Sequence, residues 1–261
     1  MREAIDLGFV TVTPWHLANS IAIATAGLTS LWRLQRAGYP RSLIIRGMVL
    51  TIAVGVAGTA AAYFIVGLTD GFIKQGVWRP TVSGSTIIGA LVAGSLTAYG
   101  LCRWHGISPG RALDAGLVPV PLGQAIGRIG CFLAPCCTGR PTDSWLGMML
   151  PDGAGMWARR YPSQLMASFF DLLIFAALLL VERRAGGLRH SAPGLPFPGF
   201  LTLLFLGLYC VKRFALEFTR TEPRWLGPLS WAQLASLAGL LVVFTLMAVN
   251  IRRSRQDGTK T

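Results

Sequence analysis

The chain has 261 residues, of which 52% are hydrophobic and only 13% are charged. Soluble globular domains carry about 25% charged residues, so this composition excludes an ordinary soluble domain. Several uncharged runs approach or exceed the ~20 residues that a spanning helix needs, which predicts an all-α integral membrane protein. The net charge of +13 does not indicate nucleic-acid binding, because the basic residues lie in short segments between apolar runs.

The first apolar run is predicted to remain in the protein as a membrane span. A secretory signal peptide has a basic start and a small-residue cleavage site. Here Arg2 is followed by the acidic residues Glu3 and Asp6, and no such cleavage site closes the run. We therefore expect a single membrane domain over residues 1–261, without a separate soluble module.

Seven spans are expected in chain order. In the second, Gly58 and Ala62 have the small-xxx-small spacing that allows close helix packing. The fourth contains Pro119 and Pro121, which should kink it and leave carbonyls for neighbouring helices to satisfy. The expected ranges are 14–32, 47–68, 86–101, 113–134, 163–181, 199–218 and 229–250.

The distribution of basic residues predicts the orientation of these spans. An odd number of spans places the two termini on opposite sides, and Arg and Lys are more frequent in the segments on the side of the C-terminus. The positive-inside rule then favours N-out, C-in. In this topology a periplasmic loop, residues 135–162, connects spans four and five.

An arginine lies inside the apolar fourth span, between Gly127 and Gly130. The guanidinium of Arg128 stays charged, so at membrane depth it needs an anion, a cavity or a path to the interface. The glycines let another backbone or a ligand come close. We interpret Arg128 as a candidate functional residue, and the alternative is a helix-end arginine that snorkels to the headgroups.

A polar stripe is predicted on the sixth span. Tyr209, Arg213, Glu217 and Arg220 follow one another at helical spacing and therefore share one helix face. Pairing of Arg213 with Glu217 lowers the cost of placing either in lipid. Opposite Arg128, the stripe would form a polar pocket whose guanidiniums suit a phosphate. The alternative is a structural ion-pair network between helices.

A cluster of thiols, Cys131, Cys136 and Cys137, follows Arg128. It lacks the C-x-x-C spacing of zinc and redox sites, and a disulfide, a thiol nucleophile and small buried side chains all stay open. His16 is a candidate base at the start of span one, and the alternative is an interfacial pair with Trp15. The sequence contains no metal cage or nucleotide motif, so no metal or cofactor is expected.

Several motifs between the fourth span and the C-terminus form a set. They are Gly127-Arg128-Ile129-Gly130-x-Phe132, Gly139, Tyr161-Pro162-Ser163-Gln164-Leu165, Tyr209, Arg213-Phe214-x-x-Glu217-Phe218-x-Arg220 and Ser230-x-x-Gln233-x-x-Ser236. In order, spacing and expected topology this set resembles the prolipoprotein diacylglyceryl transferase family.

The resemblance implies a bacterial inner-membrane enzyme with its active site facing the periplasm. It would move the diacylglyceryl group of phosphatidylglycerol to the lipobox cysteine thiol in a prolipoprotein signal peptide, and glycerol 1-phosphate would leave. Membrane lipids and the prolipoprotein are then the expected partners, and nucleic acid is not.

The resemblance also implies roles for individual residues. Tyr209 would face the lipid headgroup, and Glu217 would shape the site. The expected headgroup-binding residues are Arg128, Arg213, Gly139, Gly127, Gly130 and Arg220.

The chain departs from the family pattern at residues that would handle the proton. Gly84 stands where the family has a histidine, and residues 58–63 lack the family's arginine in span two. An asparagine of the family is Cys131 here and an acidic residue is Cys136, while Tyr161 replaces the histidine of His-Pro-Ser-Gln. A replacement base is needed, and the candidates are His16 and Glu217.

Three hypotheses follow. The chain is an active diacylglyceryl transferase or a relative with another acceptor, a non-catalytic binder of anionic phospholipid with the same fold, or a periplasm-facing thiol protein. The first two share the phosphate pocket and differ in the need for a base.

Overall fold

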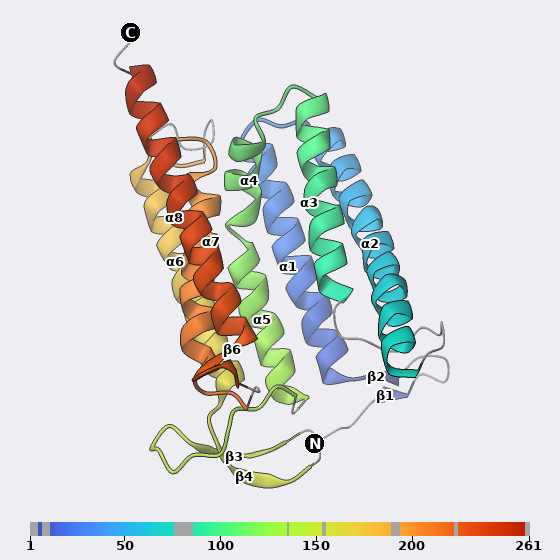
Figure 1. Cartoon of the computed structure of the whole chain (residues 1–261). Helices are drawn as coiled ribbons and strands as arrows, with labels where there is room; N and C mark the ends of the chain where they lie inside the picture. Colours follow the sequence, from blue (N-terminus) through green and yellow to red (C-terminus); the bar gives the residue numbers. More distant parts are fainter. Residues whose placement is uncertain are drawn as a thin grey trace.

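A computed structural model describes residues 5–6, 11–75, 86–134, 136–152, 155–188, 194–221 and 224–258 (Figure 1). Within these ranges the chain is helical, with three small antiparallel sheets at helix ends. The helices are α1 (Pro14–Arg36), α2 (Arg41–Gln75), α3 (Thr86–Trp104), α4 (Pro109–Leu117), α5 (Val120–Leu133), α6 (Ser163–Arg184), α7 (Phe200–Glu217) and α8 (Trp231–Gly258). The sheets pair β1 (Ile5–Asp6) with β2 (Thr11–Val12), β3 (Met148–Pro151) with β4 (Trp157–Arg160), and β5 (Arg224–Leu226) with β6 (Leu229–Ser230).

Several helical segments are long and apolar enough to cross a membrane, which supports the predicted membrane class. In the described part of the chain they are Arg41–Ala62, Pro109–Leu133, Ser163–Arg184 and Trp231–Gln256. Helices α1, α3 and α7 run alongside these segments, and α1 begins at the end of the bundle opposite to the end of α8 (Figure 1).

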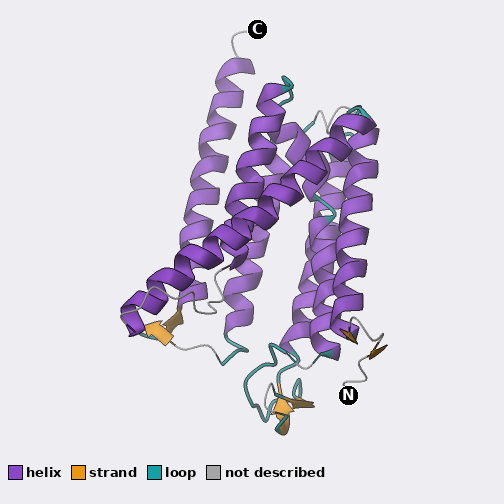
Figure 2. Cartoon of the chain, turned by 90° about the vertical axis from the view of Figure 1, so that its right-hand side faces the viewer, coloured by secondary structure: helices purple, strands orange, loops and turns teal. Residues whose placement is uncertain are grey.

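The helices form two groups with α5 between them. Helices α2 and α3 pack together as a hairpin, while α6, α7 and α8 form the other group (Figures 1 and 2). Helix α5 contacts both α1 and α6. A core of Ile174, Leu178, Leu201 and Phe205 joins α6 to α7. A side chain on α5 is therefore placed to meet residues of α6 and α7.

The fourth span is divided at Pro119 instead of being kinked as predicted, with α4 before the break and α5 after it. Proline has no N–H to bond the carbonyl of Ala115, four residues earlier. Arg33 Nε of α1 donates to that carbonyl instead, at 2.8 Å, and Ser30 Oγ donates to the Gly116 carbonyl at 2.7 Å. As predicted, a neighbouring helix satisfies the carbonyls that the break leaves free.

The predicted close packing of Gly58 and Ala62 is confirmed, and α3 is the partner helix. A β-carbon on Gly58 would lie 2.5 Å from Ala93 Cβ, and one on Gly89 would lie 2.6 Å from Ala62 Cβ. Small residues on both helices thus allow the two backbones to approach closely.

Two helices extend beyond the spans predicted for them. Helix α2 begins at Arg41 and continues to Gln75, through part of the segment expected to be a polar loop, and α8 continues to Gly258. Hydropathy marks only the apolar part of a helix, whereas backbone hydrogen bonding continues through polar residues with good helix propensity.

Candidate active site

Tyr209, Arg213 and Glu217 of the stripe predicted on the sixth span lie on α7, whereas Arg220 follows the end of this helix. Tyr209, Arg213 and Arg220 line one pocket with Arg128. Residues of α6 and of the loop after α5 complete it, so segments far apart in the sequence meet here. The other lining residues are Cys137, Ser163, Gln164, Ala167, Lys212 and Leu216.

Glu217 is buried beside this pocket and holds Arg213. The distance from Arg213 Nη1 to Glu217 Oε2 is 2.9 Å, and the exposed fractions of the two side chains are 28% and 2%. Ser230 Oγ, just before α8, donates to Glu217 Oε1 at 2.9 Å, and the Ser230 N–H donates to Gln233 Oε1 at 3.0 Å. The predicted Arg213–Glu217 pair is confirmed, and α8 fixes the carboxylate from its other side.

A second buried ion pair joins α7 to α6. Lys212 Nζ donates to Asp171 Oδ1, and both side chains are almost inaccessible. The same Nζ lies 4.4 Å from the ring centroid of Tyr209, a cation–π contact. A buried charge without a partner is costly, so each member of this pair depends on the other.

Cations outnumber carboxylates around the pocket. Lys212 and Arg213 each pair with one acid, whereas Arg128 and Arg220 form no ion pair with any residue in the described ranges. Guanidiniums keep their charge and bind phosphate oxygens through two parallel hydrogen bonds. Two unpaired guanidiniums in one pocket therefore make a site for a phosphate-like anion.

The pocket is closed in this structure. Its volume is about 20 Å³, enough for about one water molecule. A phosphate group is larger, so its entry would require the long arginine side chains to move outward. Arg213 is already partly exposed, which provides a route for that movement.

The loop after α5 reaches the pocket through a close contact at Gly139. The Gly139 N–H donates to the Tyr161 carbonyl at 3.1 Å, and the Arg140 N–H donates to the Thr219 carbonyl at 2.8 Å. A β-carbon on Gly139 would lie 2.5 Å from Ser163 Oγ and 2.8 Å from the Thr219 carbonyl oxygen. Only glycine leaves room for this junction, as the expected close approach of the loop requires.

Gln164 connects the same loop to α6. Its Nε2 donates to the Cys136 carbonyl at 2.8 Å, while Oε1 is buried without a hydrogen-bond partner among the described residues. Buried acceptors are normally satisfied, so an unpaired one that lines a pocket is available to a donor on a ligand.

Comparison with known sequences identifies the family of this chain. The sequence model of the prolipoprotein diacylglyceryl transferase family matches residues 2–249. The chain belongs to the prolipoprotein diacylglyceryl transferase family.

Curated relatives agree with this membership. The phosphatidylglycerol--prolipoprotein diacylglyceryl transferase of Clostridium tetani is 30% identical over 228 residues, covering 86% of this chain and 87% of the relative. That of Gloeobacter violaceus is 30% identical over 223 residues, with coverages of 82% and 80%. Enzyme 2 of Clostridium perfringens is 28% identical over 245 residues, with coverages of 91% and 90%. The resemblance noted in the sequence is confirmed, and the chain is a transferase of this family.

The two glycines beside Arg128 face α1, whereas Arg128 faces the pocket. A β-carbon on Gly130 would lie 2.6 Å from Ala18 Cβ, and one on Gly127 would lie 3.5 Å from Asn19 Oδ1. In this diacylglyceryl transferase the close approach that the glycines allow is made by a neighbouring helix. They act on Arg128 by setting the position of α5.

His16 lies at the N-terminus of α1 and does not line the Arg128 pocket. Its Nδ1 accepts from the Thr13 N–H at 3.3 Å, and the His16 N–H donates to Thr13 Oγ1 at 3.4 Å, which forms a capping box. The Trp15 and His16 rings meet edge-to-face at 5.1 Å. The Trp15–His16 ring contact of the alternative interpretation is thus present.

The cysteines are all free thiols, so the structure contains no disulfide. Cys137 is exposed at the pocket with a left-handed φ of 59°. Cys136 Sγ contacts the Cys131 carbonyl at 3.6 Å. Burial, together with the neighbouring thiols of Cys131 and Cys137, raises the pKa of the Cys136 thiol to about 12. Cys136 is therefore protonated at neutral pH and is a poor nucleophile.

Of two departures from the family pattern, only Tyr161 lies among the described residues. Gly84, at the position of the family histidine, lies outside the described residues. Tyr161, which replaces another family histidine, lies in the loop over the pocket. A hydrogen bond with the Thr142 side chain is the main cause that lowers the pKa of Tyr161.

The sequence analysis assigned no role to four residues that shape this site. Lys212 and Asp171 are charged residues inside apolar runs, and that signal would have marked each of them as a candidate site residue without identifying its partner. Ser163 Oγ hydrogen-bonds Thr219 Oγ1 at 2.8 Å, but hydroxyl pairs across helices leave no pattern in a sequence.

Proposed function

We propose that this family member transfers the diacylglyceryl group of phosphatidylglycerol to the lipobox cysteine of a prolipoprotein. The observation that supports this most directly is the convergence of Arg128 and Arg220, both unpaired within the described residues, on one pocket. Two relatives that match more than 80% of this chain are named as phosphatidylglycerol--prolipoprotein diacylglyceryl transferases. The pocket supplies the charge that a phosphodiester headgroup needs.

The proposed reaction is a nucleophilic substitution at a glycerol carbon of phosphatidylglycerol. The cysteine sulfur attacks the glycerol carbon that bears the phosphate, so a C–S bond forms and a C–O bond breaks. The electron pair leaves on glycerol 1-phosphate, which gains negative charge as it departs. Arg128, Arg220 and Arg213 stabilise that charge, the kind of electrostatic effect that contributes most in enzymes.

The thiol proton must also leave, because the thiolate is the nucleophile. Of the two predicted bases, Glu217 is held beside the pocket by Arg213 and Ser230, whereas His16 caps α1. We therefore assign proton acceptance to Glu217. Tyr209 faces the headgroup, with its ring positioned by the Lys212 ammonium.

Gln164 favours binding of phosphatidylglycerol over anionic lipids whose headgroups lack hydroxyls. Its buried Oε1 is an acceptor without a partner in the described structure, and it lines the pocket. The headgroup glycerol carries hydroxyls that donate. A headgroup without hydroxyls leaves this acceptor unsatisfied, at a free-energy cost of about 1–3 kcal/mol.

The membrane setting forms part of this proposal. We infer one domain over residues 1–261 with seven spans, N-out and C-in, in the bacterial inner membrane. This orientation places Arg128 and the loop after α5 on the periplasmic side. The lipid headgroup and an exported lipobox cysteine would then meet at the outer leaflet.

The test is transfer from labelled phosphatidylglycerol to a lipobox peptide by the purified full chain in liposomes. We expect Arg128→Ala to lower kcat/KM on the order of 100-fold, the typical cost of losing one transition-state charge contact. Arg103→Ala is the matched control, since Arg103 is exposed on α3 and does not line the pocket. Full transfer by Arg128→Ala would refute the assignment. Lipid binding without transfer by the wild type would instead support a non-catalytic lipid binder.

A further inference from the structure

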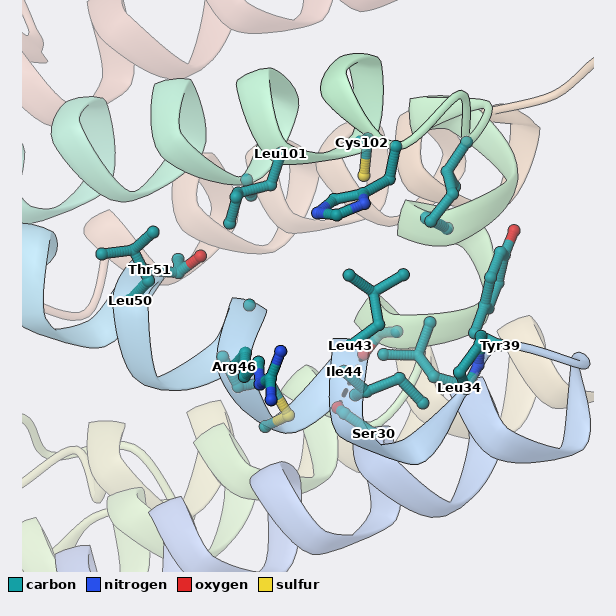
Figure 3. Close-up of a pocket in the computed structure, with 18 of the residues that line it drawn as sticks. Ser30, Leu34, Tyr39, Leu43, Ile44, Arg46, Leu50, Thr51, Leu101 and Cys102 are labelled. Atoms are coloured by element: carbon teal, nitrogen blue, oxygen red, sulfur yellow. Dashed lines mark hydrogen bonds between the residues drawn. The ribbon is translucent and has the colours of Figure 1, made fainter.

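A second, larger cavity lies at the opposite end of the helices from Arg128. Its volume is about 600 Å³, within the range of ligand-binding cavities. It is enclosed by the last part of α1, the first part of α2, the end of α3, and α4. Leu101 of α3 and Leu43 of α2 point into the space between these helices (Figure 3).

The lining is apolar apart from a few side chains. Apolar residues form most of it, and Arg46 and His105 are the lining residues that can carry a positive charge. Both are exposed, and neither forms an ion pair within the described residues. The hydroxyl-bearing residue Tyr39 also lines this cavity (Figure 3).

No carboxylate among the lining residues neutralises this charge. Asp114 of α4 directly follows the lining residue Leu113 but does not line the cavity. Its carboxylate accepts hydrogen bonds from the Gly199 N–H at 2.7 Å and the Thr202 N–H at 2.9 Å. It thereby satisfies the first N–H groups of α7. Arg46 is left as an uncompensated cation beside an apolar cavity.

We propose that this cavity binds one acyl chain of an anionic phospholipid, with the lipid phosphate on Arg46 and His105. Basic pockets between membrane helices bind anionic headgroups, and an apolar cavity between helices suits a hydrocarbon chain. A zwitterionic lipid brings its own ammonium, for which this cavity lining offers no carboxylate partner. The charge therefore selects an anionic lipid.

This site is independent of the transfer reaction and shares no lining residue with the Arg128 pocket. It predicts two classes of anionic-lipid site in one chain. Each class then depends on its own arginine, Arg128 at one end and Arg46 at the other.

The test is native mass spectrometry of the purified full chain in detergent, titrated with phosphatidylglycerol or phosphatidylcholine. We expect two phosphatidylglycerol binding events in the wild type. Arg46→Gln should weaken one of them about fivefold, the order expected for one basic residue next to an anionic lipid. Arg103→Gln, at the same end of α3 but outside the cavity lining, is the matched control.

A second variant tests the cavity itself. Ala98→Phe places a ring in the lining and should remove the same binding event, whereas Ala53→Phe on the exposed face of α2 should not. Wild-type lipid affinity in both Arg46→Gln and Ala98→Phe, or equal binding of phosphatidylcholine at this site, would overturn the proposal. Loss of both binding events in Arg128→Gln would overturn it too, while leaving the proposed function intact.

Discussion

Lys212 of α7 and Asp171 of α6 form a buried ion pair at the edge of the pocket that holds Arg128. The same ammonium lies over the ring of Tyr209, so one contact orders both a helix pair and an aromatic side chain of the site. The pair also prevents Lys212 from being an isolated buried charge, and it leaves Arg128 and Arg220 as the guanidiniums available to an anion.

Replacement of Lys212 by methionine should destabilise the protein. Lys212→Met leaves the Asp171 carboxylate buried without its cation, at a cost of about 3–5 kcal/mol. The double variant Asp171→Asn with Lys212→Met removes both charges and should recover most of the loss. Thermal unfolding in detergent measures both effects, and equal melting temperatures for Lys212→Met and the wild type would contradict this role.

Replacement of Glu217 separates proton transfer from packing. In Glu217→Gln the side-chain carbonyl still accepts from Ser230, but the carboxylate that pairs with Arg213 is lost. We expect kcat to fall at least about 100-fold, the low end for removal of a general base. Ser230→Ala removes the hydrogen bond to Glu217 and the one from the Gln233 N–H but keeps the carboxylate, and it serves as the comparison, with a smaller loss of kcat. A Glu217→Gln enzyme with wild-type kcat would show that the proton goes elsewhere.

Gly139 should not tolerate any side chain. In Gly139→Ala the new methyl would meet Ser163 Oγ and the Thr219 carbonyl, so the loop must shift away from α6 and α7. Transfer should decline along with the melting temperature. Gly100→Ala is the control, since nothing lies within 4 Å of a β-carbon there and alanine favours a helix. Similar behaviour of the two variants would mean that the loop junction is not needed.

The reactivity of the cysteines should depend on pH. Because the pKa of Cys136 is about 12, its thiolate fraction and alkylation rate should rise about tenfold per pH unit between pH 7 and 10. Peptide mass spectrometry after timed alkylation measures this slope. Rapid, pH-independent modification of Cys136 would contradict the raised pKa.

The thiol hypothesis has its own test. A triple Cys131→Ser, Cys136→Ser, Cys137→Ser variant should retain transfer, since the proposed nucleophile belongs to the substrate. Loss of transfer in a variant that still binds phosphatidylglycerol would assign chemistry to these thiols.

Gln164→Leu should change lipid preference. The variant loses the unpaired buried acceptor, so phosphatidylglycerol should bind about fivefold more weakly, the order of one hydrogen bond. Phosphatidic acid has no headgroup glycerol and is the internal control, because its affinity should not change. An equal loss for both lipids would indicate a general disturbance of the loop that Gln164 holds at Cys136.

Local patterns in the sequence were enough for the membrane class, the Tyr209–Arg213–Glu217 stripe on α7 and the family. An uncharged run long enough to span a bilayer indicates a membrane helix whatever the rest of the fold is. Residues spaced three and four apart on one helix share a face of that helix. The predicted Arg213–Glu217 pair followed from this periodicity, since its members are four positions apart on one helix.

The tertiary structure alone decided which charges are paired and which are free. Lys212 and Asp171 are 41 positions apart, and Arg33 and Glu182, which form a buried pair at 2.6 Å, are 149 apart. Spacing within one helix says nothing about partners on other helices. The division of the fourth span at Pro119 and the lack of an ion pair for Arg128 within the described residues both depend on how α5 packs between α1 and α6. That packing, set by complementary surfaces across the whole bundle, made Arg128 and Arg220 available to an anion.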